Sequence, residues 1–203
     1  MIKIILTILI LIISYLYGSI PFALVIGKVF YHTDVRDYGS GNLGGSNAGR
    51  VLGKKAGFIV IALDASKAIV TTVLAGLMAK IFSLNYDIIY LAALCCIIGH
   101  CYPIFAGFKG GKAVASSFGY FLVINPIGAL IALVIFLLVL KISKYVSLSS
   151  ICAAICCGVL TLLMPISIEG KIINFLIVFL IVYRHKSNIN KIKNGTENKV
   201  SWI

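Results

Sequence analysis

Residues 113–140 read AVASSFGYFLVINPIGALIALVIFLLVL and carry no charged side chain over 28 positions. As a single α-helix this stretch would be about 42 Å long, well beyond the roughly 30 Å of a bilayer's hydrocarbon core. Asn125 and Pro126 lie near its middle, and proline removes a backbone donor and disfavours helix at the residue before it. We therefore expect two short helices that fold back on each other.

The rest of the chain is similarly apolar. Of its 203 residues, 61% are hydrophobic and 12% charged, and the mean hydropathy of +1.08 excludes an ordinary soluble protein. The N-terminal run is too long for a signal peptide, and five of the six cysteines lie in apolar runs, so we expect neither cleavage nor disulfides. The sequence predicts an all-α integral membrane protein with apolar stretches at 4–27, 56–80, 86–106, 113–140, 148–168 and 172–183.

The charges decide the topology. There are 18 Lys and Arg against six Asp and Glu, and cytoplasmic loops collect the basic residues. If 113–140 forms a hairpin, fourteen basic residues lie inside and three outside, whereas a single crossing gives eight and nine. We therefore predict about seven transmembrane or partly spanning helices, with the N-terminus outside and the C-terminus in the cytoplasm. The net charge of +12 also predicts an anionic lipid or substrate as partner.

This topology places three polar segments, 32–55, 100–112 and 184–203, on the cytoplasmic side, where they can converge. The first contains five glycines within residues 39–49, followed by Arg50. Such a backbone exposes several N–H groups to one anion, and arginine adds a planar fork of donors. A flexible connecting loop has the same composition, and this alternative stays open.

The second segment ends in Gly110, Gly111 and Lys112 and runs into an apolar helix expected at Ala113. Free N–H groups, the positive helix end and a lysine then surround one point, which favours a phosphate. The segment is not a Walker A loop, because Ala106 stands where the first glycine belongs. A basic helix end at the lipid headgroups explains Lys109 about as well as a site role.

The third segment, Tyr183 to Ile189, follows the last apolar stretch and contains His185 and Asn188. Basic residues at this place usually form only a stop-transfer signal. A histidine and an asparagine are not needed for that purpose, so a role in the site is the other interpretation.

Two further pairs need an explanation. His32 and Asp37 have the His-x4-Asp spacing of acyl-CoA-dependent glycerolipid acyltransferases, but nothing downstream resembles the other blocks of those enzymes. Asp64 and Lys67 lie inside an apolar stretch, where an unpaired charge costs about 3 kcal/mol. At a spacing of three they can pair on one helix face, lie near the membrane surface, or contact the site.

Three motifs in order carry a family resemblance: Gly-Ser-Gly-Asn-x-Gly-x-x-Asn-x-x-Arg at 39–50, Gly-His-x-x-Pro-x-Phe-x-x-Phe-Lys-Gly-Gly-Lys at 99–112, and Tyr-Arg-His-Lys-x-Asn at 183–188. Together they resemble the bacterial acyl-phosphate:glycerol-3-phosphate acyltransferases, the PlsY family. The resemblance covers nearly the whole chain, including Gly18-Ser19-Ile20-Pro21. The sequence departs from the usual pattern at Ala113, where glycine generally stands, and at Ser46, where threonine is usual.

The resemblance implies a single acyltransferase domain of residues 1–203 in the cell inner membrane, with its active site facing the cytoplasm. It implies transfer of a fatty acyl group from acyl phosphate to the sn-1 hydroxyl of glycerol 3-phosphate, which forms lysophosphatidic acid and phosphate. Membrane lipid is the other expected partner, and neither a cofactor, a metal nor a nucleic acid is expected. A small transporter for an organic phosphate is the alternative, but most polar residues lie at one face rather than at the midplane.

The resemblance also implies roles for individual residues. Phosphate and the polarised carbonyl would be bound by catalytic residues, namely Arg50, Lys112, His185 and Asn188. Substrate binding would involve Ser40, Gly41, Asn42, Asn47, Lys109, Gly110, Gly111 and Ser150. Either His185 or a substrate phosphate would accept the proton, and Glu197 would brace the tail.

Overall fold

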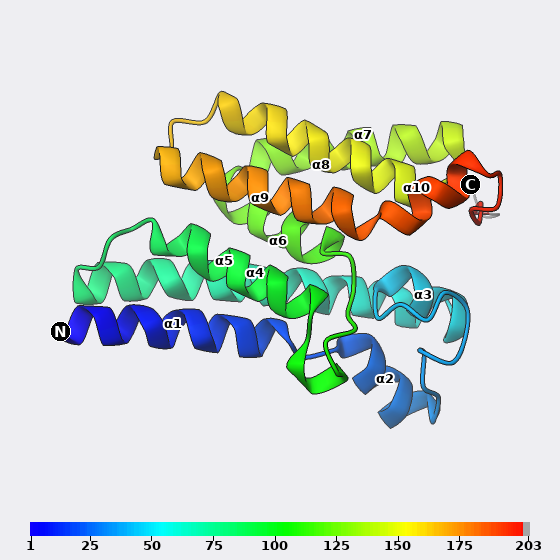
Figure 1. Cartoon of the computed structure of the whole chain (residues 1–203), viewed down its shortest axis with the longest axis horizontal. Helices are drawn as coiled ribbons and strands as arrows, with labels where there is room; N and C mark the ends of the chain where they lie inside the picture. The colour runs from blue at the N-terminus through cyan, green and yellow to red at the C-terminus, as the bar shows by residue number, and fades with distance from the viewer. Residues whose placement is uncertain (201–203) are drawn as a thin grey trace. The chain divides into compact units, whose positions relative to one another are not determined.

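The computed structural model describes residues 1–200, and within them every regular element is a helix, as the sequence predicts (Figure 1). The chain forms two compact units, Met1–Tyr120 and the part that begins at Phe121. The elements are α1 (Ile2–Gly18), α2 (Phe22–Tyr31), α3 (Gly45–Val51), α4 (Lys54–Phe82), α5 (Ile88–Cys101), the 3₁₀ turn η1 (Ile104–Ala106), α6 (Val114–Ile124), α7 (Pro126–Ser143), α8 (Val146–Leu162), α9 (Ile168–Arg184) and α10 (Lys186–Lys193).

In the first unit, α1 and α4 both pack against α5 (Figure 1). The approach of α1 to α5 is close enough to require glycine. A Cβ on Gly18 would overlap the carbonyl of Cys96, and a Cβ on Gly99 would overlap the carbonyl oxygen of Tyr15. Small residues at such crossings let helix backbones meet, which is how helices associate in a lipid environment. The ends of α1 and α5 are thereby held together where the second polar segment begins.

The short helix α3 is fixed on the beginning of α4 in the same way. A Cβ on Gly57 of α4 would overlap the backbone of Gly49, and one on Gly45 would overlap the side chain of Ile61. This packing places the last turn of α3, which carries Arg50, beside the start of a 29-residue helix.

The N-terminal apolar run, predicted at residues 4–27, is not one continuous helix. The helix α1 ends at Gly18, and α2 begins at Phe22 with a bend of 43° between them. Pro21 precedes α2 and has no N–H to donate, so the helical hydrogen bonds cannot continue through it. The carbonyls of Gly18 and Ile20 are consequently available to other donors.

In the second unit, α7 packs on α8 and α8 packs on α9, while α10 contacts both α8 and α9 (Figure 1). The break predicted at Asn125 is confirmed. Asn125 lies between α6 and α7, its Oδ1 accepts a hydrogen bond of 2.9 Å from the N–H of Gly128, and Pro126 is the first residue of α7. An asparagine cap followed by proline is a favoured way to begin a helix.

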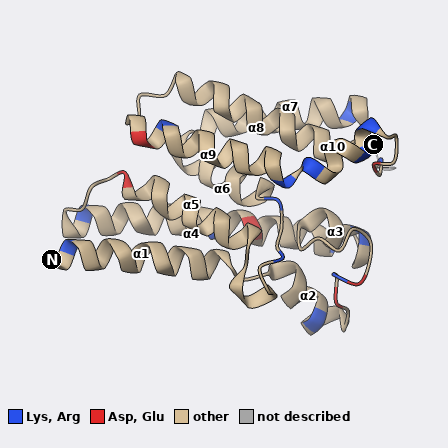
Figure 2. Ribbon diagram, in the orientation of Figure 1, with Lys and Arg blue, Asp and Glu red and all other residues tan. Residues whose placement is uncertain are grey.

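Three helical segments are long and apolar enough to cross a membrane: Lys54–Phe82, Ile88–Ala106 and Pro126–Ser143. The bent pair α1 and α2 makes a fourth if it counts as one span. Large apolar side chains are exposed along these helices, including Ile13, Phe58 and Leu138, as expected for surfaces that face lipid. Within the first unit, charged residues are sparse along the long helices and gather toward helix ends and loops (Figure 2).

Candidate active site

The first glycine-rich loop is held by the buried side chain of Asn47. Its Nδ2 donates to the carbonyls of Val35 at 2.8 Å and Tyr38 at 3.3 Å, and its Oδ1 accepts from the N–H of Ser40 at 2.8 Å. Gly39 has a φ of 64°, a left-handed conformation that glycine adopts without strain. Asn47 therefore supports the loop from beneath, and the side chain of Ser40 lies at its exposed surface.

Asn42 joins the first loop to the second. Its Oδ1 accepts from the N–H of Gly44 at 3.0 Å, and its Nδ2 donates to the carbonyl of Gly110 at 3.1 Å. Asn42 and Gly110 are 68 positions apart in the chain. The first two of the three polar segments thus converge within one unit.

The second loop turns back onto the end of α5. The N–H of Gly110 donates to the carbonyl of Cys101 at 3.1 Å, and that of Gly111 donates to the carbonyl of His100 at 3.0 Å. Lys112 follows and is partly buried, while Lys109 is exposed. The basic side chains therefore lie on either side of a glycine pair whose main chain is fixed.

The junction between this loop and α6 differs from expectation. The helix begins at Val114 rather than at Ala113, and Ala113 is fully buried with a left-handed φ of 67°. Alanine in this conformation is strained by about 1–2 kcal/mol, because its Cβ crowds the following carbonyl oxygen. The left-handed turn explains why glycine is the usual residue here in the family that the sequence resembles.

Arg50 lies in the last turn of α3, and its side chain is exposed. An exposed guanidinium keeps its fork of donors accessible to a phosphate.

In the loop before α3, Asp34 accepts hydrogen bonds from the Nε of Arg36 at 2.9 Å and from its Nη2. The Arg36 side chain holds the pKa of Asp34 well below its usual range. These bonds fix the local conformation at the start of the loop.

Asp64 and Lys67 form the ion pair that their spacing predicts, with Oδ1 and Nζ 2.9 Å apart, and both side chains are almost completely buried. Sequence reasoning missed the third member of this cluster, His100, whose Nδ1 lies 3.4 Å from the same carboxylate oxygen. His100 comes from α5, and no local spacing signals a histidine 33 positions beyond Lys67.

His32 and Asp37, which the sequence suggested as a pair, are not bonded to each other in the structure. His32 ends α2 with a left-handed φ of 48°, and both side chains are exposed. Within residues 1–200, no hydrogen bond or ion pair joins the two side chains. A histidine base oriented by this aspartate is therefore not formed.

In the second unit, His185 lies between α9 and α10 and is buried. Its Nδ1 is 2.8 Å from the carbonyl oxygen of Ile181. A carbonyl oxygen only accepts, so Nδ1 carries the proton, and in the neutral imidazole Nε2 is then the basic nitrogen. The buried Ser150, near the start of α8, donates to the carbonyl of Val146 at 2.8 Å.

Glu197 connects the tail to α8 and α10 in the second unit. Its Oε1 accepts hydrogen bonds from the Nδ2 of Asn188 and from the Oγ of Ser147, both at 2.7 Å. This geometry confirms that Glu197 braces the tail. Ser147 was missed from the sequence, because a serine at the start of an apolar helix carries no signal of a partner 50 positions away.

Known proteins of one family match this chain along nearly its whole length. The profile of the family described as glycerol-3-phosphate acyltransferase matches residues 8–195. A glycerol-3-phosphate acyltransferase from Listeria monocytogenes is 46% identical over 97% of this chain and 98% of its own. The glycerol-3-phosphate acyltransferase 2 of Bacillus anthracis is 48% identical over 95% of this chain and 98% of its own.

Solved structures agree as well. Crystal structures of PlsY (YgiH), an integral membrane glycerol 3-phosphate acyltransferase, exist in a glycerol 3-phosphate form and a lysophosphatidic acid form. The first superposes with a TM-score of 0.89 at 35% identity and covers 96% of each chain. The second has a TM-score of 0.86 at 34% identity and covers 96% of this chain and 95% of its own.

Proposed function

This chain belongs to the glycerol-3-phosphate acyltransferase family, and from this premise we propose that it transfers a fatty acyl group from acyl phosphate to the sn-1 hydroxyl of glycerol 3-phosphate. The products are lysophosphatidic acid and inorganic phosphate, which makes the reaction the first committed step of bacterial phospholipid synthesis. The observation that carries the proposal is the Asn42–Gly110 hydrogen bond of 3.1 Å. It joins two glycine-rich basic loops, one for each phosphate-bearing substrate.

The first loop binds the acyl phosphate. Ser40 offers its side-chain hydroxyl at the surface of the unit, beside Asn42. The N–H groups of Ser40 and Gly41 donate to Asn47 and to the carbonyl of Tyr38, so the main chain of the loop is held in place. A hydroxyl on a fixed main chain can donate to a phosphate oxygen and replace part of the water that the phosphate loses on binding. The acyl chain extends from this loop along the apolar helices.

The second loop binds the phosphate of glycerol 3-phosphate. Gly110 and Gly111 have a fixed main chain, and Lys109 and Lys112 supply positive charge beside it. Arg50, exposed at the end of α3, adds a third cation within the same unit. These cations neutralise the phosphates and the negative charge that develops on the carbonyl oxygen.

The chemistry needs no covalent nucleophile, because acyl phosphate is already an activated mixed anhydride. The sn-1 hydroxyl oxygen forms a bond to the carbonyl carbon, and the bond from that carbon to the phosphate oxygen breaks. Phosphate leaves with the electron pair. The hydroxyl proton goes to the Nε2 of His185 or to a substrate phosphate, and Asn188 and Ser150 contribute from the second unit.

We also propose the membrane arrangement that the basic residues favour. The protein has about seven transmembrane or partly spanning helices in the cell inner membrane, with the N-terminus outside and the C-terminus and active site in the cytoplasm. Residues 1–203 act as a single acyltransferase domain. Of this range, residues 201–203 lie outside the described part of the chain.

The experiment is a reconstitution. Purified protein in detergent receives acyl phosphate and glycerol 3-phosphate, and we expect lysophosphatidic acid and inorganic phosphate in equal amounts, with Lys112→Ala as the inactive comparison. Proteoliposomes distinguish the transporter alternative. Accumulation of glycerol 3-phosphate inside the vesicles without any acylated product would refute the acyltransferase assignment.

A further inference from the structure

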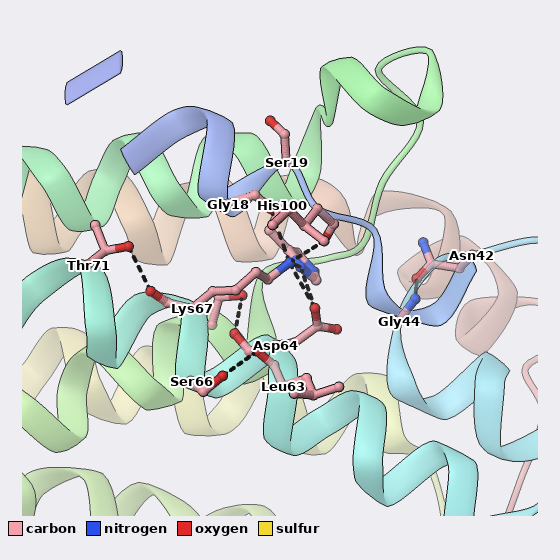
Figure 3. Close-up of polar contacts among 12 residues, drawn as sticks. Gly18, Ser19, Asn42, Gly44, Leu63, Asp64, Ser66, Lys67, Thr71 and His100 are labelled. Atoms are coloured by element: carbon pink, nitrogen blue, oxygen red, sulfur yellow. Dashed lines mark hydrogen bonds and ion pairs between the residues drawn. The ribbon is translucent and has the colours of Figure 1, made fainter. Parts of the chain in front are cut away.

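Three ionisable side chains lie together in the interior of the first unit and have no part in the chemistry described above (Figure 3). Asp64 and Lys67 come from α4 and His100 from the end of α5, and their exposed fractions are only 2%, 1% and 6%. A pair alone would neutralise the charges of Asp64 and Lys67. The addition of a histidine, and the direction in which it faces, indicate a further purpose.

The protons of Lys67 decide how the cluster is bonded. Its Nζ lies 3.0 Å from the carbonyl oxygens of both Gly18 and Ile20, and 2.9 Å from the Oδ1 of Asp64. An ammonium group has three protons to donate, and these three oxygens take all of them. The Nδ1 of His100 lies 3.3 Å from the same Nζ and is the fourth polar group around it.

His100 is oriented by both members of the ion pair. Its Nδ1 lies 3.4 Å from the Oδ1 of Asp64 and 3.3 Å from the Nζ of Lys67. The opposite edge of the ring then faces the second loop. A Cβ placed on Gly111 would overlap Nε2 of His100, so the ring lies directly against the main chain of Gly111.

The contacts continue from His100 into both loops. The carbonyl of His100 accepts from Gly111 at 3.0 Å, and the carbonyl of Gly110 accepts from the side chain of Asn42 at 3.1 Å. Asn42 in turn accepts from the N–H of Gly44 at 3.0 Å. Figure 3 shows Asn42 and Gly44 on the side of His100 that faces away from Thr71.

We propose that Asp64, Lys67 and His100 are positioning residues for the reaction: they fix the imidazole of His100 so that it sets the place of the Gly110–Gly111 main chain, and through Asn42 that of the first loop. The proposal rests on the proposed function, in which the second loop binds the phosphate of glycerol 3-phosphate. Ionic groups suit this task because a buried charge has few alternative arrangements in which it stays paired.

The test is a double-mutant cycle between Asp64→Asn, which keeps the size of the side chain, and Gly111→Ala, which displaces the ring from the loop side. Each change alone should raise KM for glycerol 3-phosphate by about tenfold or more, because a small displacement of a binding group is costly. The KM for acyl phosphate should rise less. The two effects should not multiply in the double variant, since both act on the same imidazole.

Tryptic cleavage after Lys109 provides a second measurement that needs no activity. The N–H of Gly110 is bonded to Cys101 in the native loop, so cleavage there should be slow in the wild type and about tenfold faster in Asp64→Asn. If Asp64→Asn does not fold, His100→Asn takes its place in both measurements. Inactive wild-type protein would refute the proposed function, whereas cleavage rates would still test the positioning role.

Thr72→Val is the matched control. Thr72 is also buried on α4, but its hydroxyl donates only to the carbonyl of Ala68 in its own helix, at 2.7 Å. It should leave KM and the cleavage rate unchanged even if the thermal midpoint falls. An unchanged KM in Asp64→Asn, multiplying effects in the cycle, or equal cleavage in Asp64→Asn and the wild type would each overturn the positioning role.

Discussion

Lys67 and Arg50 carry the same charge but have opposite surroundings. The ammonium of Lys67 is buried and bonded to three oxygens, so it has no donor left for a substrate. The guanidinium of Arg50 is exposed at the end of a short helix. A cation that binds a substrate phosphate must keep donors accessible in the unliganded protein. These surroundings indicate that Lys67 stabilises the fold, whereas Arg50 is available to bind substrate.

We expect Arg50→Ala and Lys112→Ala each to lower kcat/KM by a factor of about 100 or more, because each removes a charged donor to developing negative charge. Lys193→Ala, a change of an exposed lysine at the end of α10, serves as the control and should behave like the wild type. Initial rates of lysophosphatidic acid formation measure all three. Near-normal activity in correctly inserted Lys112→Ala protein would contradict the role assigned to that lysine.

The left-handed conformation of Ala113 predicts that glycine can replace this residue at less cost in stability than it can replace its neighbour Ala115. Ala113→Gly relieves about 1–2 kcal/mol of left-handed strain, which offsets the lost methyl group and the greater freedom of the unfolded chain. Ala115→Gly has no strain to relieve inside α6 and should cost about 1 kcal/mol. Thermal midpoints in detergent compare them. An equal loss of stability in both variants would argue against the left-handed turn.

At the scale of helices, local chemistry could be read from the sequence. Asn125 and Pro126 predict the break between α6 and α7, because a cap and a missing N–H act within a few residues. Pro21 breaks the first apolar run for the same reason, yet uniform hydropathy on both sides concealed it. Hydropathy measures where a segment prefers to lie, whereas a bend depends on backbone donors that hydropathy does not count.

Contacts between distant elements could not be read in this way. The convergence of the first two loops was expected from topology, but the Asn42–Gly110 bond that produces it depends on packing between helices. His100 was taken as part of a motif, and nothing in its neighbourhood indicated Asp64 as a partner. Ser147 and Glu197 are similarly remote in sequence. Such pairs form because the fold brings their elements together, and a single sequence does not show which distant residues become neighbours in space.

The brace between α8 and α10 leads to a prediction about these elements. Glu197→Ala removes the acceptor shared by Ser147 and Asn188 and should lower the unfolding free energy by about 2 kcal/mol, because hydrogen bonds to a carboxylate are stronger than neutral ones. Activity should fall too, since Asn188 loses its anchor. Glu197→Gln keeps an acceptor oxygen and should recover part of both losses.

Glu169→Ala is the control for this brace. Glu169 is an exposed acid in the first turn of α9, where a carboxylate contributes only about 0.5 kcal/mol. Denaturation midpoints and initial rates are measured side by side. If Glu197→Ala proves no more harmful than Glu169→Ala, the brace contributes nothing.

For the molecule as a whole, the distribution of basic residues predicts which ends of the helices share a side of the membrane. In a cysteine-free background, Lys141→Cys and Lys193→Cys should be protected from a membrane-impermeant thiol reagent in intact cells, and Lys80→Cys should be labelled. All three side chains are exposed. Labelling at position 141 from outside, with position 193 still protected, would show that residues 113–140 cross only once.

The choice of acyl donor also belongs to the whole chain, because coenzyme A is large and needs an extended surface for its adenosine and pantetheine parts. Within residues 1–200, the longest stretch between helices is residues 32–44, and its inner part is committed to the Asn47 and Asn42 contacts. The one hint of coenzyme A chemistry, the His32/Asp37 spacing, forms no contact between the two side chains in that same region.

Acyl phosphate should therefore support turnover without added metal or nucleotide, acyl-CoA should not, and His32→Ala should keep wild-type activity, because the anhydride is reactive enough without a His–Asp base. The measurement is lysophosphatidic acid formation from each donor at matched chain length, with Lys112→Ala confirming that the product arises at the proposed site. Efficient transfer from acyl-CoA that disappears in His32→Ala or Asp37→Ala would replace this mechanism with that of the coenzyme A-dependent enzymes. Transfer from acyl-CoA that survives both changes would instead mean that the two glycine-rich loops accept the larger leaving group.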